Sequence, residues 1–202
     1  MVNVCLFVAD GNDEIEFSAP WGVFTRAQIP IDSVYVGENP EKLVTMSRGV
    51  QLYAKRSLKE FKSVEEFASH YDVVIVPGGV KGANTLSTDE FVKKVVSSYW
   101  KKAGKVIGMI CAGTLTAKTT GLSATEITGH PSVRKDLEEA GFRYIPQPVV
   151  VENNLITSMG PGTALLWALK LLEQVTTKET YDTVYQALTM PEKQIVYAAN
   201  RE

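Results

Sequence analysis

Residues 106–114 constrain the fold of this chain more than any other stretch. Their apolar, β-branched first half is typical of a buried strand, and Cys111, Ala112 and Gly113 follow before a helical pattern begins at Leu115. This order predicts a sharp strand-to-helix turn with the thiol exposed at its tip, facing the N–H groups and the dipole of the helix N-terminus. The stretch is therefore a candidate nucleophile elbow. The alternative is that Cys111 is a small buried apolar residue, as unpaired cysteines commonly are.

The composition limits the class of protein. Of the 202 residues, 45% are hydrophobic and 22% are charged, and 21 basic against 23 acidic residues leave a net charge of −2. We expect a single domain over residues 1–202 with one substantial core. A near-neutral charge without a Lys/Arg run argues against nucleic acid as a partner.

The sequence also argues against a membrane-spanning protein and against a small disulfide-rich protein. Residues 1–9 are apolar but too short for a signal-peptide core, and no apolar stretch approaches the ~20 residues of a membrane span. We expect no membrane partner and a cytoplasmic location, with nuclear access left open. Cys5 and Cys111 are too few for a disulfide framework. His70 and His130 match no usual metal-ligand spacing, so we expect no metal.

Apolar runs alternate with helical patterns along the chain. Strands are expected at residues 2–9, 33–36, 50–54, 72–76, 106–110, 149–151 and 155–157. Helices are expected at residues 14–27, 60–69, 89–102, 131–140, 164–175 and 179–188, and another begins at Leu115. Ile15 is expected on the buried side of the first helix, Thr163 as an N-cap, and residues 195–197 as a tail packed on the body. The alternation predicts an α/β fold with a mostly parallel sheet and helices on both faces.

Four unusual turns follow predicted strands, at residues 10–16, 77–79, 111–113 and 128–131. In parallel sheets, ligands bind beyond the carboxyl ends of the strands. We therefore expect these turns to converge on one rim.

The turns supply residues for chemistry around the thiol. A helix N-terminus is expected to lower the pKa of Cys111. Beside the sulfur, a buried Glu16 is expected to be pushed toward its neutral form, from which it donates a hydrogen bond or moves protons. The alternative is a solvated glutamate at an acidic helix start. The backbone N–H groups of Gly79 and Ala112 are candidates for an oxyanion hole.

Two further residues are candidates for the same site, each with a structural alternative. His130 lies between a glycine and a proline beyond a predicted strand, where it is either a helper base or a plain turn residue. Arg48 is either a carboxylate ligand or a surface arginine of a loop.

Together these motifs resemble one known family. Glu16 after the first strand, Ile110 to Gly113, and the runs at residues 71–79, 128–131 and 157–163 match in order and spacing from about Val2 to about Leu188. The chain resembles the ThiJ/PfpI superfamily, in its branch of parkinsonism-associated "DJ-one" proteins.

The resemblance implies a flavodoxin-like three-layer sandwich, related to class I glutamine amidotransferases, and a homodimer. It also implies a nucleophilic Cys111 that is prone to oxidation to sulfinate, with Glu16 hydrogen-bonded to it and His130 nearby. Members of the family act as glutathione-independent glyoxalases, as protein deglycases and as redox-regulated, chaperone-like protective proteins.

Some positions differ from the residues that related proteins carry there. Ala112 stands where peptidase-like members carry His, and the late His-x-Glu pair of the amidotransferases is absent, which argues against peptidase and amidase activity. Thr114 stands where this branch often has Pro, and Met159 where relatives carry Arg.

Two functions follow from these expectations. The first is a cofactor-free glyoxalase that protects against reactive dicarbonyls. Its Cys111 adds to methylglyoxal, and Glu16, with His130 as helper, moves protons to give lactate. The alternative is a redox-sensing, chaperone-like protein in which peroxide oxidises Cys111, or a protein deglycase.

Overall fold

A seven-stranded sheet forms the centre of the computed structural model, which describes residues 2–190. Its strand order is β10-β11-β7-β6-β1-β2-β5, and all neighbouring pairs are parallel except β10 with β11. The strands are β1 (Val4–Val8), β2 (Ile31–Tyr35), β5 (Arg56–Ser57), β6 (Val73–Val76), β7 (Val106–Ile110), β10 (Val149–Glu152) and β11 (Leu155–Ser158). Every residue of β1, β6, β7 and β11 is buried, as expected for strands covered on both faces.

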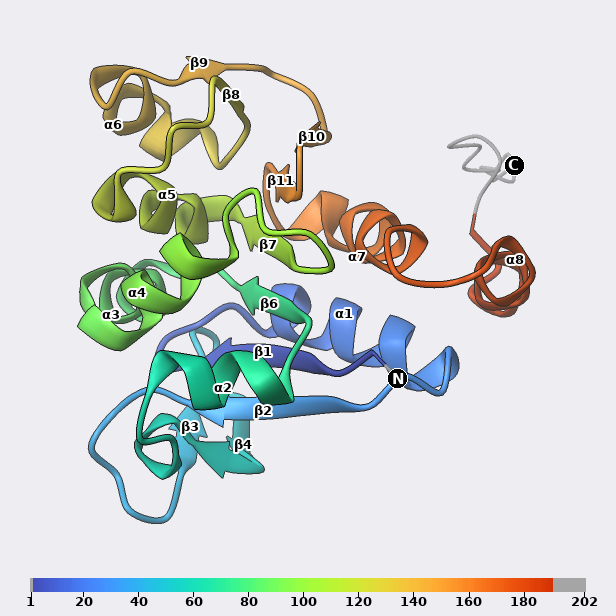
Figure 1. The fold of residues 1–202 in the computed structure, drawn as a ribbon, viewed down its shortest axis with the longest axis horizontal. Helices are drawn as coiled ribbons and strands as arrows, with labels where there is room; N and C mark the ends of the chain where they lie inside the picture. The colour runs from blue at the N-terminus through green and yellow to red at the C-terminus, as the bar shows by residue number, and fades with distance from the viewer. Residues whose placement is uncertain (1, 191–202) are drawn as a thin grey trace, which may run out of the picture.

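Helices cover both faces of this sheet (Figure 1). One face packs against α1 (Glu14–Arg26), α7 (Ala164–Glu173) and α8 (Lys178–Ala187). The other face packs against α2 (Val64–His70), α3 (Val80–Thr88), α4 (Glu90–Tyr99), α5 (Leu115–Thr120) and α6 (Arg134–Glu139). The expected three-layer α/β architecture is confirmed. Within residues 2–190, no helix is both long enough and apolar enough to cross a membrane.

The strand order places a topological switch point between β1 and β6. From β1 the chain builds outward through β2 to β5, and from β6 it builds the other way through β7 to β11. The connections after β1 and β6 therefore leave on opposite faces of the sheet and open a crevice at its carboxyl edge, where ligands bind in folds of this kind.

Short elements complete the fold. The hairpin β3 (Leu43–Thr45) with β4 (Gln51–Tyr53), and the pair β8 (Glu126–Ile127) with β9 (Arg143–Tyr144), form two small separate sheets. Four 3-10 turns are η1 (Leu58–Glu60), η2 (Cys111–Thr114), η3 (Pro131–Val133) and η4 (Pro161–Thr163). The run predicted as a strand at residues 50–54 is thus β4, outside the main sheet.

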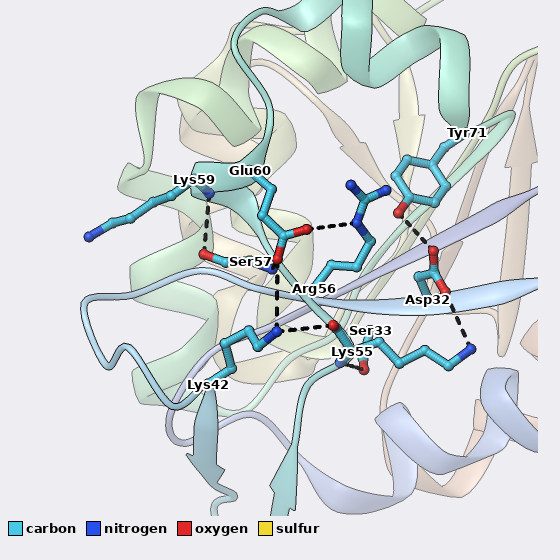
Figure 2. Close-up of polar contacts among 9 residues, drawn as sticks. All are labelled: Asp32, Ser33, Lys42, Lys55, Arg56, Ser57, Lys59, Glu60 and Tyr71. Atoms are coloured by element: carbon cyan, nitrogen blue, oxygen red, sulfur yellow. Dashed lines mark hydrogen bonds and ion pairs between the residues drawn. The ribbon is translucent and has the colours of Figure 1, made fainter.

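Polar side chains protect the β5 edge of the main sheet (Figure 2). Arg56 Nε donates to Glu60 at 2.9 Å, and the Tyr71 hydroxyl donates to Asp32 at 3.0 Å. Lys55 pairs with the same Asp32 at 3.3 Å. Charged side chains and a very short edge strand disfavour pairing with another chain at this edge.

Two local predictions need correction, and one helix was not predicted. Ile15 is 57% exposed, because the buried face of α1 includes its neighbours Glu16 and Phe17 instead. Thr163 occupies the N-cap position of α7 without capping it, since its hydroxyl oxygen accepts from the preceding Gly160 N–H at 3.2 Å instead of from an N–H of the helix. Helix α3 was not predicted: it has no side-chain cap, and Gly82 interrupts its short pattern. The predicted tail at residues 195–197 lies outside the described residues.

Candidate active site

A cavity of about 660 Å³ opens at the carboxyl edge of the sheet, at the switch point. Residues from all four predicted turns line this cavity. The prediction that the turns converge at one edge of the sheet is confirmed. The lining residues that the argument below uses are Arg48, Gly79, Cys111, Ala112, His130 and Ser132.

Cys111 has an unusual backbone. It follows β7 directly and opens η2 with a φ of 59°, in the left-handed region that non-glycine residues rarely adopt. The Thr114 hydroxyl donates to the Cys111 carbonyl at 2.7 Å, and Gly113 packs so closely that a Cβ there would lie 2.6 Å from the Val76 carbonyl oxygen. The elbow therefore depends on small or hydrogen-bonding residues on both sides of the cysteine, and it presents a half-buried thiol to the cavity.

Glu16 lies beneath this thiol, fully buried in the first turn of α1. The Gly78 N–H donates to its Oε2 at 2.7 Å, whereas Oε1 is buried without a conventional partner among the described residues. A Cβ at Gly78 would lie 2.7 Å from both Cys111 Cβ and Glu16 Oε2, so glycine is required for the two groups to meet here. The solvated alternative for Glu16 is ruled out by its burial.

Asn12 ties the turns after β1 and β6 together. Its Oδ1 accepts from the Ala9 N–H at 2.7 Å, and its Nδ2 donates to the Gly78 carbonyl at 2.7 Å. The side chain is fully buried, so each of these bonds satisfies a backbone group that has no access to water. Asn12 thereby places the Gly78–Gly79 backbone against Glu16 and Cys111, a role that the sequence pattern did not reveal.

Burial controls the titration of the Cys111–Glu16 pair. Desolvation raises the pKa of Glu16 to about 7, and desolvation together with the charge of Glu16 raises the pKa of Cys111 to about 12. The predicted lowering of the pKa of Cys111 is therefore wrong: the Ala112 and Gly79 N–H groups do lower it, but burial beside a carboxylate outweighs them.

The two groups contact each other and titrate together. The pair loses one proton near pH 7 and holds the second to much higher pH. A thiolate near neutral pH therefore requires that the remaining proton sit on Glu16, next to the sulfur.

The raised pKa of Glu16 predicts a pH-dependent stability. The folded chain keeps this proton to about pH 7, whereas the unfolded chain releases it near the ordinary glutamate pKa of about 4.5. The stabilisation is complete below about pH 4.5 and is lost as pH rises toward 7, with an amplitude on the order of 3 kcal/mol. We expect urea unfolding at pH 5 and pH 8 to show this loss in wild type and not in Glu16→Gln.

Glu60→Gln serves as the control. Although burial opposes it, hydrogen bonds from Ser57 and Arg56 lower the pKa of Glu60, so its contribution is complete at both pH 5 and pH 8 and is lost only at lower pH. We therefore expect Glu60→Gln to keep the wild-type loss of stability between pH 5 and pH 8. Equal pH profiles for wild type and Glu16→Gln would contradict a neutral buried Glu16.

A loop above the pocket is held by Glu14 in the first turn of α1. The carboxylate accepts from the Ser47 hydroxyl at 2.9 Å and from the Arg48 N–H. Although burial opposes it, these bonds lower the pKa of Glu14, so that its charge persists to lower pH. Arg48 lines the cavity, and its side chain donates weakly to the Ser47 carbonyl at 3.4 Å.

His130 stands at the rim as the cap of η3 and is exposed. Its Nδ1 lies 2.8 Å from Ser132 Oγ and accepts from the Ser132 N–H at 3.2 Å. Both residues line the cavity with Cys111, so the structure brings all five predicted site residues to one place. Ser132 was missed, and its only signal in the sequence is its position two residues after the histidine.

Comparison with known proteins places this architecture in a family. The DJ-1/PfpI family model matches residues 2–174. The chain belongs to the DJ-1/PfpI family. It is 66% identical over 191 residues to "Glutathione-independent glyoxalase DJ-1" of Schizosaccharomyces pombe, which covers 95% of this chain and 100% of that relative. It is 29% identical over 178 residues to "Glutathione-independent glyoxalase DJR-1.2" of Caenorhabditis elegans, with coverage of 88% and 90%.

Solved structures agree with the family assignment. The structure of S. pombe DJ-1 matches with a TM-score of 0.93 and 66% identity, over 94% of this chain and 100% of that one. The structure of DJ-1beta from Drosophila melanogaster matches with a TM-score of 0.82 and 31% identity, over 95% and 100%. The resemblance drawn from the motifs is confirmed, including its DJ-1 branch.

Proposed function

We propose that this protein is a glutathione-independent glyoxalase that converts methylglyoxal to lactate. The observation that carries the proposal is the buried Glu16 carboxyl in contact with a half-buried Cys111 thiol on a strained elbow. The names of the two glyoxalase relatives support the same activity.

The first step joins the substrate to the protein. In the form of the pair with its proton on Glu16, the Cys111 thiolate adds to the aldehyde carbon of methylglyoxal, and a hemithioacetal forms. The N–H groups of Gly79 and Ala112, which already face the sulfur, stabilise the negative oxygen that develops.

The second step moves a proton between neighbouring carbons. Glu16, having given its proton to the hemithioacetal oxygen, takes the hydrogen from the former aldehyde carbon, and an enediolate results with its negative charge on the former ketone oxygen. Glu16 returns that proton to the adjacent carbon, and the hemithioacetal hydroxyl passes its own proton to the former ketone oxygen, which gives a thioester of lactate. Water then cleaves the thioester, which releases lactate and restores the thiol. No external reductant, oxidant or glutathione enters this balance.

An exposed apolar surface on α1 and α7 bears on the assembly of the protein. Exposed apolar side chains on α1 and α7, which pack side by side, supply a surface for a second copy of the chain: Ile15 is 57%, Leu165 42% and Leu166 48% exposed. A homodimer is therefore the assembly that we propose. We also propose a cytoplasmic location.

Lactate formation tests the function directly. Purified, freshly reduced protein is given methylglyoxal without glutathione, and lactate is measured enzymatically. We expect multiple turnovers. A reduced protein that consumes no methylglyoxal beyond one equivalent, bound at Cys111, would overturn the proposed activity.

A further inference from the structure

The hydrogen bonds of His130 identify its neutral tautomer. The Ser132 N–H is 3.2 Å from Nδ1, and an amide N–H only donates, so Nδ1 is the accepting nitrogen. The Ser132 hydroxyl, 2.8 Å from the same atom, completes the contact. The neutral ring therefore carries its proton on Nε2.

The remaining nitrogen is the one available to a ligand. Nδ1 is turned toward the first turn of η3, and Cδ2 lies beside Gly160, where an added Cβ would be 3.6 Å away. The Nε2–H group is the other polar group of the ring, and His130 lines the same cavity as Cys111 and Ala112. His130 thus places a hydrogen-bond donor at the wall of the cavity.

We propose that Ser132 is a positioning residue that fixes neutral His130 in its Nε2–H form, so that His130 donates a hydrogen bond to the substrate and is not a base. This assignment deepens the proposed glyoxalase function and rests on it. It replaces the helper-base role that the sequence suggested for His130.

The reaction needs such a donor. When a proton leaves the former aldehyde carbon, negative charge develops on the ketone oxygen of methylglyoxal. A neutral imidazole N–H placed toward that oxygen stabilises the charge without transferring its proton, as a neutral histidine electrophile does in other enzymes. Glu16 then remains the one group of the site that carries the proton from carbon to carbon.

The chain contains its own reference for the test. It has two histidines, and His70 Nδ1 lies 2.8 Å from the Glu66 carbonyl oxygen, which only accepts. His70 is therefore expected as Nδ1–H and His130 as Nε2–H. Long-range ¹H–¹⁵N correlation spectra of the two neutral rings distinguish the forms in one sample.

Ser132→Ala removes the shorter of the two contacts to Nδ1 and keeps the longer one, from the backbone N–H at 3.2 Å. Because the longer contact alone holds Nδ1 as an acceptor less firmly, we expect a fraction of His130 in the Nδ1–H form and a kcat about fivefold lower, with KM changed less than about twofold, the size expected for one lost hydrogen bond. Ser132→Thr, which keeps the hydroxyl, is expected to restore both. Ser69→Ala makes the matched change beside His70, where Ser69 Oγ is 3.4 Å from Nδ1, and leaves the His130 signals unchanged.

A second pair of variants separates a donor from a base. The amide of His130→Gln donates a hydrogen bond but takes no proton, so it is expected to retain about tenfold more turnover than His130→Ala. Equal losses in the two variants would overturn the donor role.

Two spectral results would overturn the positioning role: an Nδ1–H ring at His130 in wild type, or an unchanged tautomer and kcat in Ser132→Ala. The spectrum is independent of turnover. An Nε2–H ring in a protein without lactate formation would support the role of Ser132 and reject the proposed activity.

Discussion

Cys111→Ala is expected to lower lactate formation from methylglyoxal by about 10⁴-fold or more, the scale on which loss of a nucleophile acts in enzymes with covalent intermediates. The thiol lines the cavity, and the Ala112 and Gly79 N–H groups face the sulfur, where they can stabilise the oxygen of an aldehyde that bonds to it. Alanine removes the covalent step and keeps the small volume that the elbow requires. Initial rates of lactate formation, measured under reducing conditions, check this loss.

Cys5→Ala is the matched control, because it removes the other thiol of the chain. Cys5 is fully buried within β1, and burial raises the pKa of its thiol well above the usual range, so it is inert as a nucleophile. We expect near wild-type turnover and a small loss of stability from this variant. Turnover retained in Cys111→Ala, or lost in Cys5→Ala with the fold intact, would contradict the assignment of the nucleophile.

Short-range patterns predicted most of the fold and the location of the site. The apolar runs of β1, β6 and β7 are buried on both faces, a situation that leaves a continuous signature in sequence. Each is followed by an unusual turn, and parallel strands necessarily bring such turns to one edge. For this reason the sequence alone predicts that Glu16, Gly79 and Cys111 share one site.

Long-range effects account for what the sequence did not reveal. Burial of the thiol and, after it, the charge of Glu16 raise the pKa of Cys111, and burial is a property of packing between β1, β6 and β7. The roles of Asn12 and Ser132 depend on hydrogen bonds to backbone atoms whose positions the sequence does not state. Helix α3 was missed because packing on the sheet, and not local propensity, stabilises it.

Glu16→Gln is expected to lower kcat about a thousandfold, within the range that general acid–base groups contribute. An amide has nearly the shape of the neutral carboxyl, and its oxygen still accepts the hydrogen bond from Gly78, so the fold and the elbow are retained. It takes no proton from carbon, however, and the hemithioacetal at Cys111 is not converted to the thioester. Lactate rates and the intact mass of the protein after incubation with methylglyoxal follow the two steps separately.

The expected pattern is a thiol that still reacts in an enzyme that no longer turns over. The charge of Glu16 raises the pKa of Cys111, so its removal is expected to leave alkylation by iodoacetamide at least as fast as in wild type. Glu16→Asp tests whether the carboxyl group must reach the substrate carbon. It keeps an acid but shortens the side chain by one methylene, and we expect little recovery of turnover relative to Glu16→Gln. If Glu16→Gln kept more than about a tenth of the wild-type kcat, a loss well below that of a general acid–base group, the proton would be moved by another residue. The donor role proposed for His130 rests on Glu16 as the group that moves the proton, so this result would contradict that role and leave the tautomer to be read from the spectrum.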